Sequence, residues 1–396
     1  MITFKKAQKI IQCNVQETNK SELIFTENAH MRILNKDYLS KSDIPRDNLS
    51  SMDGIVVFKN EKNRKLKIIG ETKAGDKKGK QFKYGECSLI FTGGPIFGND
   101  KIIIPKENFE IKQDHIQIKT LPFQNFIRKK ASDLKRNKTY LKKKTLLNIR
   151  SIVLAKSMRL KKVNVLKKPR IFVICTGDEI ISNNKKRGLV ESTNHIFIKY
   201  FTELLGGEVK MISYAEDSYD DFVKIYKSFL DFDLLITSGG ISRGKYDIVK
   251  RCLKDCGLNI LFDKVSIKPG KPTTFGKFNN NKYFLGLPGN PVSCFMSLIN
   301  FLPIFMDAFL GLKSYKLIFT KLASNKFINE NKKLTHFQRV KVKKNYFNVF
   351  KDQDSSLMSI LNSADGILIR EPNSPPIKKQ QKVNILLFKD IFKFGI

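Results

Sequence analysis

The chain has 396 residues, 41% of them hydrophobic, so it is long enough to bury a large core and to form two to four domains. Its net charge is +36, from 73 basic and 37 acidic side chains. The lysines are spread along the whole chain, which argues against a nucleic-acid-binding patch despite the charge. The first residues lack the apolar core of a signal peptide, and we expect a cytoplasmic protein.

Cysteine and histidine are too scattered to build a metal or triad site. The six cysteines form no Cys-x-x-Cys pair, and several lie in apolar runs. They are typical of free thiols in a reducing compartment. The four histidines are far apart in the sequence, so a zinc enzyme or a histidine-based triad is not indicated.

The first third of the chain predicts helices followed by a small β-rich domain. Residues 1 to 40 have the pattern of a helix, a short strand and a second helix, and a polar linker with Pro45 follows. Apolar runs broken by glycine then predict strands at Leu66–Gly70, Cys87–Phe91, Lys101–Ile104 and His115–Lys119. The basic stretch from Leu121 to Leu166 has mostly helical spacing.

From Pro169 the pattern is α/β. Strands are predicted at 171–175, 209–213 and 234–237, with helices between them. Ser192 is placed to cap a helix that ends at Gly206-Gly207. The predicted apolar face of this helix comprises Ile196, Tyr200, Phe201, Leu204 and Leu205. The apolar run Phe295–Leu312 predicts a buried helix, and the runs after Gly311 predict a small β-barrel-like domain.

Three turns rich in glycine, proline and lysine stand out in this α/β region. Ser238-Gly239-Gly240 ends a buried strand, and its glycines let backbone N–H groups approach a ligand. Lys268-Pro-Gly-Lys-Pro272 holds two ammonium groups on a rigid backbone, and Leu287-Pro-Gly-Asn-Pro291 leads into a helix. Each alone is compatible with a turn that binds nothing. Three such turns in one α/β unit favour an anion site at one rim of the sheet.

The same segments carry a family resemblance. Ser-Gly-Gly-Ile-Ser-Arg-Gly-Lys-Tyr-Asp at 238–247, Lys-Pro-Gly-Lys-Pro at 268–272 and Gly-Leu-Pro-Gly-Asn-Pro-Val-Ser at 286–293 resemble the signature segments of the MoeA family. These are molybdopterin molybdenumtransferases, and the E domain of gephyrin is similar to them. The resemblance extends over nearly the whole chain.

The resemblance implies a multi-domain α/β plus β fold. We expect a central MoaB/Mog-like α/β domain with a mostly parallel sheet, a β-rich inserted domain, an elongated split N-terminal domain and a C-terminal β-barrel-like domain. The expected boundaries are 1–45 with 139–167 for the split domain, 46–138 for the inserted domain, 168–312 for the α/β domain and 313–396 for the C-terminal domain.

The resemblance also implies the residues of the site. The expected catalytic residues are Asp53, Asp133, Asp247, Lys264 and Lys268. The expected substrate-binding residues are Thr92, Arg128, Thr176, Gly177, Asp178, Glu179, Ser238, Gly239, Gly240, Ser242, Gly244, Gly270, Lys271, Pro288, Gly289, Asn290 and Ser293. The expected ligands of a Mg²⁺ ion are Glu216, Asp217 and Asp247.

The sequence departs from the family pattern at three places. Glu216 stands where the family has Asp, so either Glu216 or its neighbour Asp217 is the metal ligand. Ala131-Ser132 replaces the Gly-Glu pair that precedes the acidic position of Asp133. Arg243 is also unusual, because the family has a small apolar residue at this point of the glycine loop.

The implied activity is the insertion of molybdate into adenylylated molybdopterin, with Mg²⁺-dependent release of AMP. Both substrates are anions, which suits a basic pocket. A homodimer is implied, with Asp53 and Asp133 acting on the partner's site, and a molybdopterin adenylyltransferase and apo-molybdoenzymes are the pathway partners. No membrane partner is expected. The alternatives are a molybdopterin adenylyltransferase, or a scaffold protein of the same fold with impaired activity. The sequence does not distinguish molybdenum from tungsten.

Overall fold

A computed structural model describes residues 1–176, 193–216, 218–240, 248–312 and 317–391. The chain divides into two compact units. The larger unit comprises Met1–Asn35, Leu146–Arg150 and Lys162–Ile396, and the smaller unit comprises Lys36–Thr145 and Ser151–Lys161. We describe each unit by itself. The division into four domains stays a prediction.

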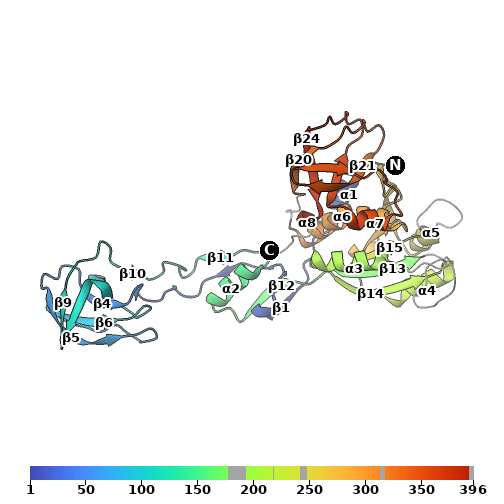
Figure 1. Cartoon of the computed structure of the whole chain (residues 1–396). Coiled ribbons are helices and arrows are strands. Elements are labelled where there is room, and N and C mark those ends of the chain that lie inside the picture. The colour runs from blue at the N-terminus through green and yellow to red at the C-terminus, as the bar shows by residue number, and fades with distance from the viewer. Residues whose placement is uncertain (177–192, 217, 241–247, 313–316, 392–396) are drawn as a thin grey trace, which may run out of the picture. The chain divides into compact units, whose positions relative to one another are not determined.

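The smaller unit is built around one six-stranded sheet. Its strand order is β7-β4-β6-β5-β9-β8, and only the pair β5–β6 is parallel. Figure 1 labels β4, β5, β6 and β9 of this sheet. The strands are β4 (Gly54–Phe58), β5 (Lys65–Thr72), β6 (Glu86–Ile90), β7 (Lys101–Pro105), β8 (Phe109–Lys112) and β9 (His115–Ile118). Aliphatic residues such as Ile55, Leu66 and Ile116 are fully buried between the strands. The β-rich region predicted from the glycine-broken runs is present.

Two short ribbons continue this unit. One pairs β3 (Leu49–Ser50) with β10 (Ile127–Arg128), and the other pairs β2 (Tyr38–Leu39) with β11 (Thr139–Leu141). In the larger unit, β1 (Ser21–Phe25) pairs with β12 (Lys162–Leu166). The chain after residue 138 therefore returns to pair with the chain before residue 40.

The helices predicted for 1–40 and 121–166 are only partly present. The first helix is α1 (Phe4–Asn14), but the second is reduced to the short 3-10 turn Thr26–Asn28. In 121–166 the single helix is α2 (Ile149–Ser157). The physical reason lies in the backbone, because Phe126, Ala131, Asn137 and Lys144 all have positive φ and break any continuous helix. The prediction of a mostly helical segment is wrong here.

The larger unit contains the central α/β sheet. Its order is β14-β13-β15-β19-β18-β16. The first four strands pair in parallel, and β18 runs antiparallel to both of its neighbours, β19 and β16. The strands are β13 (Arg170–Thr176), β14 (Glu208–Ala215), β15 (Leu234–Ser238), β16 (Asn259–Asp263), β18 (Thr274–Lys277) and β19 (Tyr283–Leu287). This arrangement confirms the predicted mostly parallel sheet.

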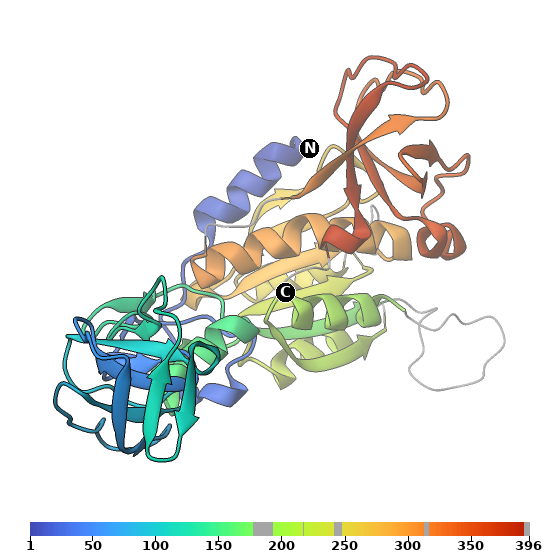
Figure 2. The same ribbon diagram turned by 60° about the vertical axis from the view of Figure 1, so that its left-hand side comes forward.

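Side chains alternate between two cores on the faces of this sheet. On β13, Ile171 and Val173 pack with α1, α3 and α6, whereas Phe172 and Ile174 pack with α4 and α5. The helices are α3 (Asn194–Leu204), α4 (Tyr219–Ser228), α5 (Ile248–Asp255) and α6 (Pro291–Leu310). The helices α1 and α6 lie side by side on one face (Figure 2).

The helix α6 is long and apolar enough to cross a membrane, but it is the core helix of the larger unit. Of its most apolar 18-residue window, 83% is buried inside the structure. It begins with a proline in its first turn and ends at Gly311, which has the left-handed conformation common at helix ends. The prediction of a buried helix is confirmed.

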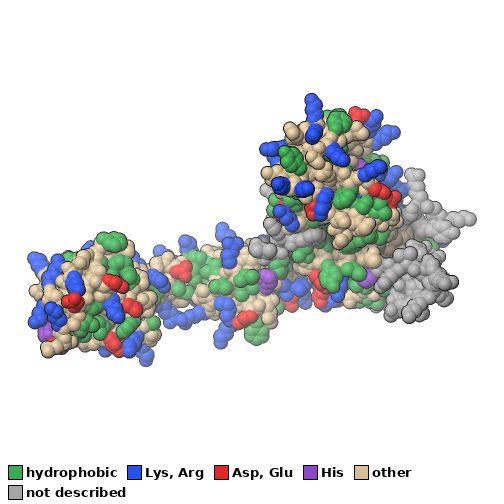
Figure 3. All heavy atoms as spheres, viewed as in Figure 1, with side chains coloured by type: hydrophobic (Ala, Val, Ile, Leu, Met, Phe, Trp, Pro, Cys, Tyr) green, Lys and Arg blue, Asp and Glu red, His purple; other side chains and the backbone are tan. Residues whose placement is uncertain are grey.

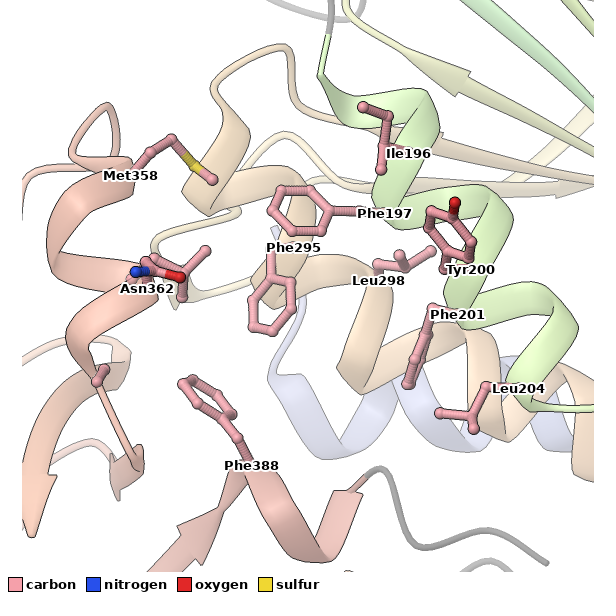
Figure 4. Close-up of a pocket in the computed structure, with 12 residues that line it drawn as sticks. Ile196, Phe197, Tyr200, Phe201, Leu204, Phe295, Leu298, Met358, Asn362 and Phe388 are labelled. Carbon is pink, nitrogen blue, oxygen red and sulfur yellow. The ribbon is translucent and has the colours of Figure 1, made fainter.

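The helix α3 carries the predicted apolar face, but part of this face is exposed. Phe201 is buried as expected, but Ile196 is 45% exposed and Tyr200 is 65% exposed. Both side chains line a largely apolar hollow of about 700 Å³ between α3, α6, α7 (Met358–Ser363) and α8 (Phe388–Ile391). Phe295 and Phe388 also face this hollow, which we call the α3 hollow (Figure 4). Ser192 lies outside the described residues, and Thr193 takes the capping position without a side-chain bond.

The C-terminal region forms a closed ring of five strands, as predicted. The ring order is β21-β22-β20-β24-β23, and a further pairing of β21 with β23 closes it, with β17 (Ile267–Lys268) attached to β21. The ring strands are β20 (Phe319–Ser324), β21 (Thr335–Lys343), β22 (Tyr346–Val349), β23 (Gly366–Arg370) and β24 (Lys382–Leu387). Through β17, this ring is continuous with the lysine turn of the α/β sheet.

Candidate active site

The first candidate turn, Ser238–Gly240, follows β15 at the carboxyl end of the parallel strands. Gly239 and Gly240 have φ values of +94° and +62°, which favour glycine. A Cβ on Gly239 would lie 2.3 Å from the carbonyl oxygen of Thr176, and one on Gly240 would lie 2.5 Å from Thr176 Oγ1. The two glycines are therefore required by the close approach of the β13 and β15 ends. The predicted residue Thr176 lies against them.

A residue that the sequence reasoning missed, Asn194, joins two of the predicted turns. Its Nδ2 donates to Ser238 Oγ and to the carbonyl oxygen of Gly289, each at 2.6 Å. Asn194 is the first residue of α3, and its side chain is only 4% exposed. The Gly239 N–H also donates to the Leu287 carbonyl at 3.1 Å. The turns after β15 and β19 are thus held together by hydrogen bonds.

The lysine turn is rigid and docks on α6. The N–H of Val265 donates to the carbonyl of Lys271, and the N–H of Lys264 donates to that of Thr273, at 2.9 and 3.1 Å. These bonds bring Lys264 close to Lys271 on one closed turn, and Lys268 lies between them with an exposed side chain. Thr273 Oγ1 bonds both the Gly270 carbonyl and Ser297 Oγ of α6, at 2.6 and 2.7 Å.

Gly270 explains why this turn needs glycine. Its φ is +109°, and a Cβ there would lie 2.6 Å from Ser297 Oγ. Lys264 itself has φ +84°, an uncommon conformation for a lysine. A non-glycine residue held in this region is a feature of constrained functional turns. One closed turn therefore carries the three predicted basic residues, Lys264, Lys268 and Lys271.

The third turn connects the α/β sheet to the C-terminal ring. Pro288 is buried, and Gly289 and Asn290 are exposed at the start of α6. Asn290 Nδ2 donates to Ser355 Oγ at 3.0 Å, and the Val292 N–H donates to the Ser355 carbonyl at 3.2 Å. Ser293 is buried in the first turn of the helix. The C-terminal region therefore supplies Ser355, a second residue that sequence reasoning missed.

Ser355 lies in a segment that the buried Arg339 organises. Arg339 is 1% exposed and donates to the carbonyls of Asp354 and Leu357 at 2.9 and 3.2 Å. Its guanidinium charge is thus balanced by carbonyl dipoles rather than by a bonded carboxylate, and burial lowers the pKa of Arg339. No sequence motif marks Ser355, because its position depends on a long-range contact.

Asp53 and Thr92, both predicted site residues, are in contact in the smaller unit. Asp53 Oδ1 accepts hydrogen bonds from the Thr92 N–H at 2.7 Å and from Thr92 Oγ1 at 2.8 Å. These two bonds, the backbone bond first, lower the pKa of Asp53, and the nearby Lys106 acts in the same direction. Asp53 is exposed and therefore carries its negative charge throughout the neutral range.

Arg128 and Asp133 also lie in the smaller unit, with exposed side chains. Arg128 is on β10 opposite Leu49, and the Asp133 N–H donates to the Ile44 carbonyl at 3.0 Å. Ala131 has φ +59°, a conformation that favours glycine. Although Ala131-Ser132 replaces the Gly-Glu pair of the family, Ala131 thus has the backbone conformation that a glycine would adopt.

Several predicted residues lie outside the described part of the chain. They are Gly177, Asp178, Glu179, Asp217, Ser242, Arg243, Gly244 and Asp247. Among the described residues, no cluster of three His, Cys, Asp or Glu side chains could hold a metal. Glu216 is described, and it is exposed just after the end of β14. Its carboxylate offers the hard oxygen donors that suit Mg²⁺, so it fits as one ligand of the predicted set.

A second buried charge supports the region between α5 and the lysine turn. Lys250 Nζ lies 3.0 Å from Asp263 Oδ1, and Thr274 Oγ1 donates to the same oxygen at 3.1 Å. Burial raises the pKa of Asp263, but Lys250, Thr274 and Lys264 outweigh it and leave the pKa below its usual value. This ion pair ties the helix after the glycine turn to the strand before the lysine turn.

Two family models match the chain. One, described as a probable molybdopterin binding domain, matches residues 172–307, and the other, described as the MoeA N-terminal region (domain I and II), matches residues 2–158. The first covers the α/β sheet with the Ser238, Lys268 and Pro288 turns. The second covers the smaller unit with Asp53 and Thr92.

Curated relatives and solved structures agree with these models. The molybdopterin molybdenumtransferase of Haemophilus influenzae is 29% identical over 323 residues, covering 80% of each chain. That of Synechocystis is 28% identical over 309 residues, covering 75% of this chain and 79% of the relative. A solved molybdopterin biosynthesis MoeA protein from Pyrococcus horikoshii is 25% identical, with a TM-score of 0.83 over 98% of this chain and 99% of that one.

The α/β sheet and the matching family model define a class of protein described as having a probable molybdopterin binding domain, and the candidate turns lie within the matched residues. The chain also has the β-rich unit and the C-terminal ring in addition to the α/β sheet, and these narrow the choice of family within this class. The chain belongs to the MoeA family.

Proposed function

We propose that this protein inserts molybdate into adenylylated molybdopterin and releases AMP as the metal joins the dithiolene. The family's activity is the transfer of molybdenum to molybdopterin, and the protein is a transferase. The adenylylated substrate and the release of AMP are the finer part of the proposal. The observation that carries it is the closed turn with Lys264, Lys268 and Lys271 in a unit that also holds the Ser238–Gly240 turn.

Charge supports this choice of substrates. Molybdate and the pyrophosphate of the adenylylated pterin are both anions, and each needs cations or N–H donors that are already in place. The lysine turn supplies three ammonium groups on a backbone fixed by its own hydrogen bonds and by Ser297. Because this backbone is ordered before binding, little loop entropy is lost on binding.

Asp53 fits the role of an ionised carboxylate better than that of a general acid. Its pKa is held low by Thr92, so it has no proton to give at neutral pH. An ionised carboxylate in a basic site orients water or binds a cation. The reaction joins two anions and cleaves a pyrophosphate, so the protein need not supply a covalent nucleophile.

We include Mg²⁺ in the proposal, with Glu216 or Asp217 and Asp247 as the ligands. Such an ion neutralises charge on phosphate oxygens. Glu216 is the described member of this set, and its backbone N–H is held by Asp221 Oδ2 at 3.0 Å. That bond fixes the start of the segment that carries the carboxylate.

The experiment follows AMP release from adenylylated molybdopterin by the purified full-length protein with Mg²⁺. We expect release that depends on molybdate and that is lost in Asp247→Asn. Tungstate in place of molybdate tests which metal is used. Binding of the substrate without AMP release at any molybdate or tungstate level would contradict the insertase proposal. Adenylylation of molybdopterin from ATP by this chain would instead favour an adenylyltransferase.

We also propose a homodimer in which a second copy covers the α3 hollow. Ile196 and Tyr200 are too exposed for core residues, and the lining around them is largely apolar. A second copy offers the same apolar face, as an interface with two-fold symmetry requires. We place the enzyme in the cytoplasm, with a molybdopterin adenylyltransferase and apo-molybdoenzymes as pathway partners. Its six cysteines, all within the described residues, form no disulfide bond, and four of them are buried.

A further inference from the structure

Asn194 has a fixed orientation at the ends of β15 and β19. Its amide nitrogen donates to Ser238 Oγ and to the Gly289 carbonyl, each at 2.6 Å. A carbonyl oxygen only accepts hydrogen bonds, so reversing the amide would set two oxygens against each other. The nitrogen must therefore face the two turns, and the oxygen Oδ1 faces away from them.

This oxygen is buried and has no hydrogen-bond partner among the residues that the structure describes. Thr176 Oγ1, at the end of the neighbouring strand β13, is also buried and has no hydrogen-bond partner among the described residues. Both residues are more than nine-tenths buried, and both adjoin the Ser238–Gly240 turn. Buried polar atoms in folded proteins are nearly always paired. Two unpaired atoms beside one candidate ligand turn point to a bound group.

The chemistry of that group follows from the acceptor. An amide oxygen accepts and cannot donate, so neither a phosphate nor molybdate in its ionised form can satisfy it. The partner must carry an N–H or O–H. In the substrate of the proposed function, both ends are nitrogen heterocycles with amino groups, the pterin and the adenine.

We propose that Asn194 positions the site through Nδ2 and reads an amino group of a nitrogen heterocycle through Oδ1. This inference rests on the proposed function for the identity of the heterocycle. The two turns that Asn194 joins are those expected to hold the substrate, so its nitrogen keeps them in register while its oxygen selects the ring. The shared chemistry is a ring amine, and its source is either the pterin or the adenine.

The test uses two pairs of probes with the full-length protein in isothermal titration calorimetry. One pair is AMP and purine riboside 5′-monophosphate, which lacks the 6-amino group. The other is 6-hydroxymethylpterin and its analogue without the 2-amino group. We expect the amine to strengthen binding in one pair by about ten- to a hundredfold, because its absence leaves a buried acceptor unpaired. The pair that shows this difference identifies the ring.

Asn194→Ala should reduce that difference to within about threefold. Thr237→Val is the matched control. Thr237 is fully buried on β15 with an unpaired hydroxyl in the described structure, and it points to the opposite face from Ser238. We expect Thr237→Val to keep the difference in affinity between the two probes of the pair. If the loss in Asn194→Ala were a general effect of removing a buried polar group, Thr237→Val would lose the difference as well.

The outcomes separate this inference from the proposed function. If AMP or hydroxymethylpterin binds but neither pair is discriminated, the inference is wrong and the proposed function stands. Discrimination that persists in Asn194→Ala likewise removes Asn194 from the role. If neither probe binds the unaltered protein, both the inference and the proposed substrate are contradicted. The comparison in the unaltered protein needs no variant, so poor folding of Asn194→Ala does not remove the test.

Discussion

At the scale of single residues, the hydrogen bonds of Asp53 set the chemistry open to this proposed site residue. Two hydrogen bonds from Thr92 hold its carboxylate in the ionised form and fix its direction at the edge of β4. A carboxylate held in this way acts as a ligand or as an orienting group, because its proton is absent across the pH range of the cell.

We predict that Asp53→Asn lowers the rate of AMP release by about a hundredfold or more, because an amide cannot replace the negative charge. Binding of the substrate, measured by calorimetry, should change by only a few fold. Asp100→Asn is the matched control, since Lys101 lowers the pKa of this exposed carboxyl in the same unit. Equal rates in Asp53→Asn and the unaltered protein would remove Asp53 from the reaction.

His336 gives a prediction of pH dependence. The pKa of His336 is lowered to about 4, against about 6.5 in the unfolded chain. Burial is the largest cause, and the positive charges of Lys268, Arg370 and Arg339 add to it. The unfolded state therefore binds the extra proton between these values, and stability is lost as the pH falls from about 6.5 to 4. Since His336 is partly exposed, we expect a loss of about 1–2 kcal/mol.

The measurement is the free energy of unfolding in urea at pH 7 and pH 4.5. His336→Gln cannot take up the proton, so it should show a smaller loss between the two pH values than the unaltered protein. His30→Gln changes an exposed histidine and should show the same loss as the unaltered protein. A loss of equal size in all three would assign the pH dependence to other groups.

At the scale of elements, the geometry of the candidate site depends on the turns and on their glycines. The Ser238–Gly240 turn packs so closely on Thr176 that no side chain fits there. We predict that Gly240→Ala costs about 2–4 kcal/mol of stability and abolishes substrate binding, because its Cβ would lie 2.5 Å from both Thr176 Oγ1 and Val249 Cγ2.

Gly257→Ala is the control for the backbone contribution alone. Gly257 also has a positive φ of +89°, but nothing lies within 4 Å of a Cβ built on it. Gly257→Ala should lower the free energy of unfolding by about 1 kcal/mol and leave substrate binding intact. Urea unfolding and calorimetry measure both effects. Similar losses of stability in the two variants would show that the close contact at Gly240 relaxes.

The sequence predicted the elements whose signals are local. The strands of the β-rich unit, the parallel sheet and the buried helix α6 were each marked by apolar runs or by proline and glycine. The three turns were also found, since they combine glycine, proline and lysine at short spacing.

The rest depended on contacts that sequence periodicity does not report. Helical spacing in 121–166 was overridden by positive φ at residues such as Ala131 and Asn137. The apolar face of α3 was predicted from its spacing, but the spacing does not report that Tyr200 of this face lines the α3 hollow. Asn194 and Ser355 carry no motif, because their partners lie 95 and 65 residues away in the chain.

At the scale of the whole molecule, the net charge opposes the proposed association of two copies, whereas the apolar α3 hollow favours it. Basic side chains cover the visible surface without forming one patch (Figure 3), and two copies each carrying +36 repel one another. The proposed association must therefore come from apolar burial, and salt should strengthen it by screening the repulsion.

We predict a homodimer in light scattering after size exclusion, with a lower dissociation constant in 0.5 M than in 0.05 M salt. Tyr200→Glu should shift the protein to monomers, because a carboxylate would be buried at the apolar α3 hollow. Phe123→Glu alters a 92% exposed aromatic residue in the smaller unit and should leave the dimer intact. A monomer under all conditions, or a dimer that tolerates Tyr200→Glu, would contradict this arrangement.

This chain transfers molybdenum to molybdopterin. The most direct measurement incubates the protein with adenylylated molybdopterin, Mg²⁺ and molybdate, and then assays the activity of an apo-molybdoenzyme supplied with the product. We predict active enzyme in proportion to the AMP released, and none when molybdate or this protein is omitted. AMP release without any active cofactor, at all molybdate and tungstate concentrations, would contradict the account.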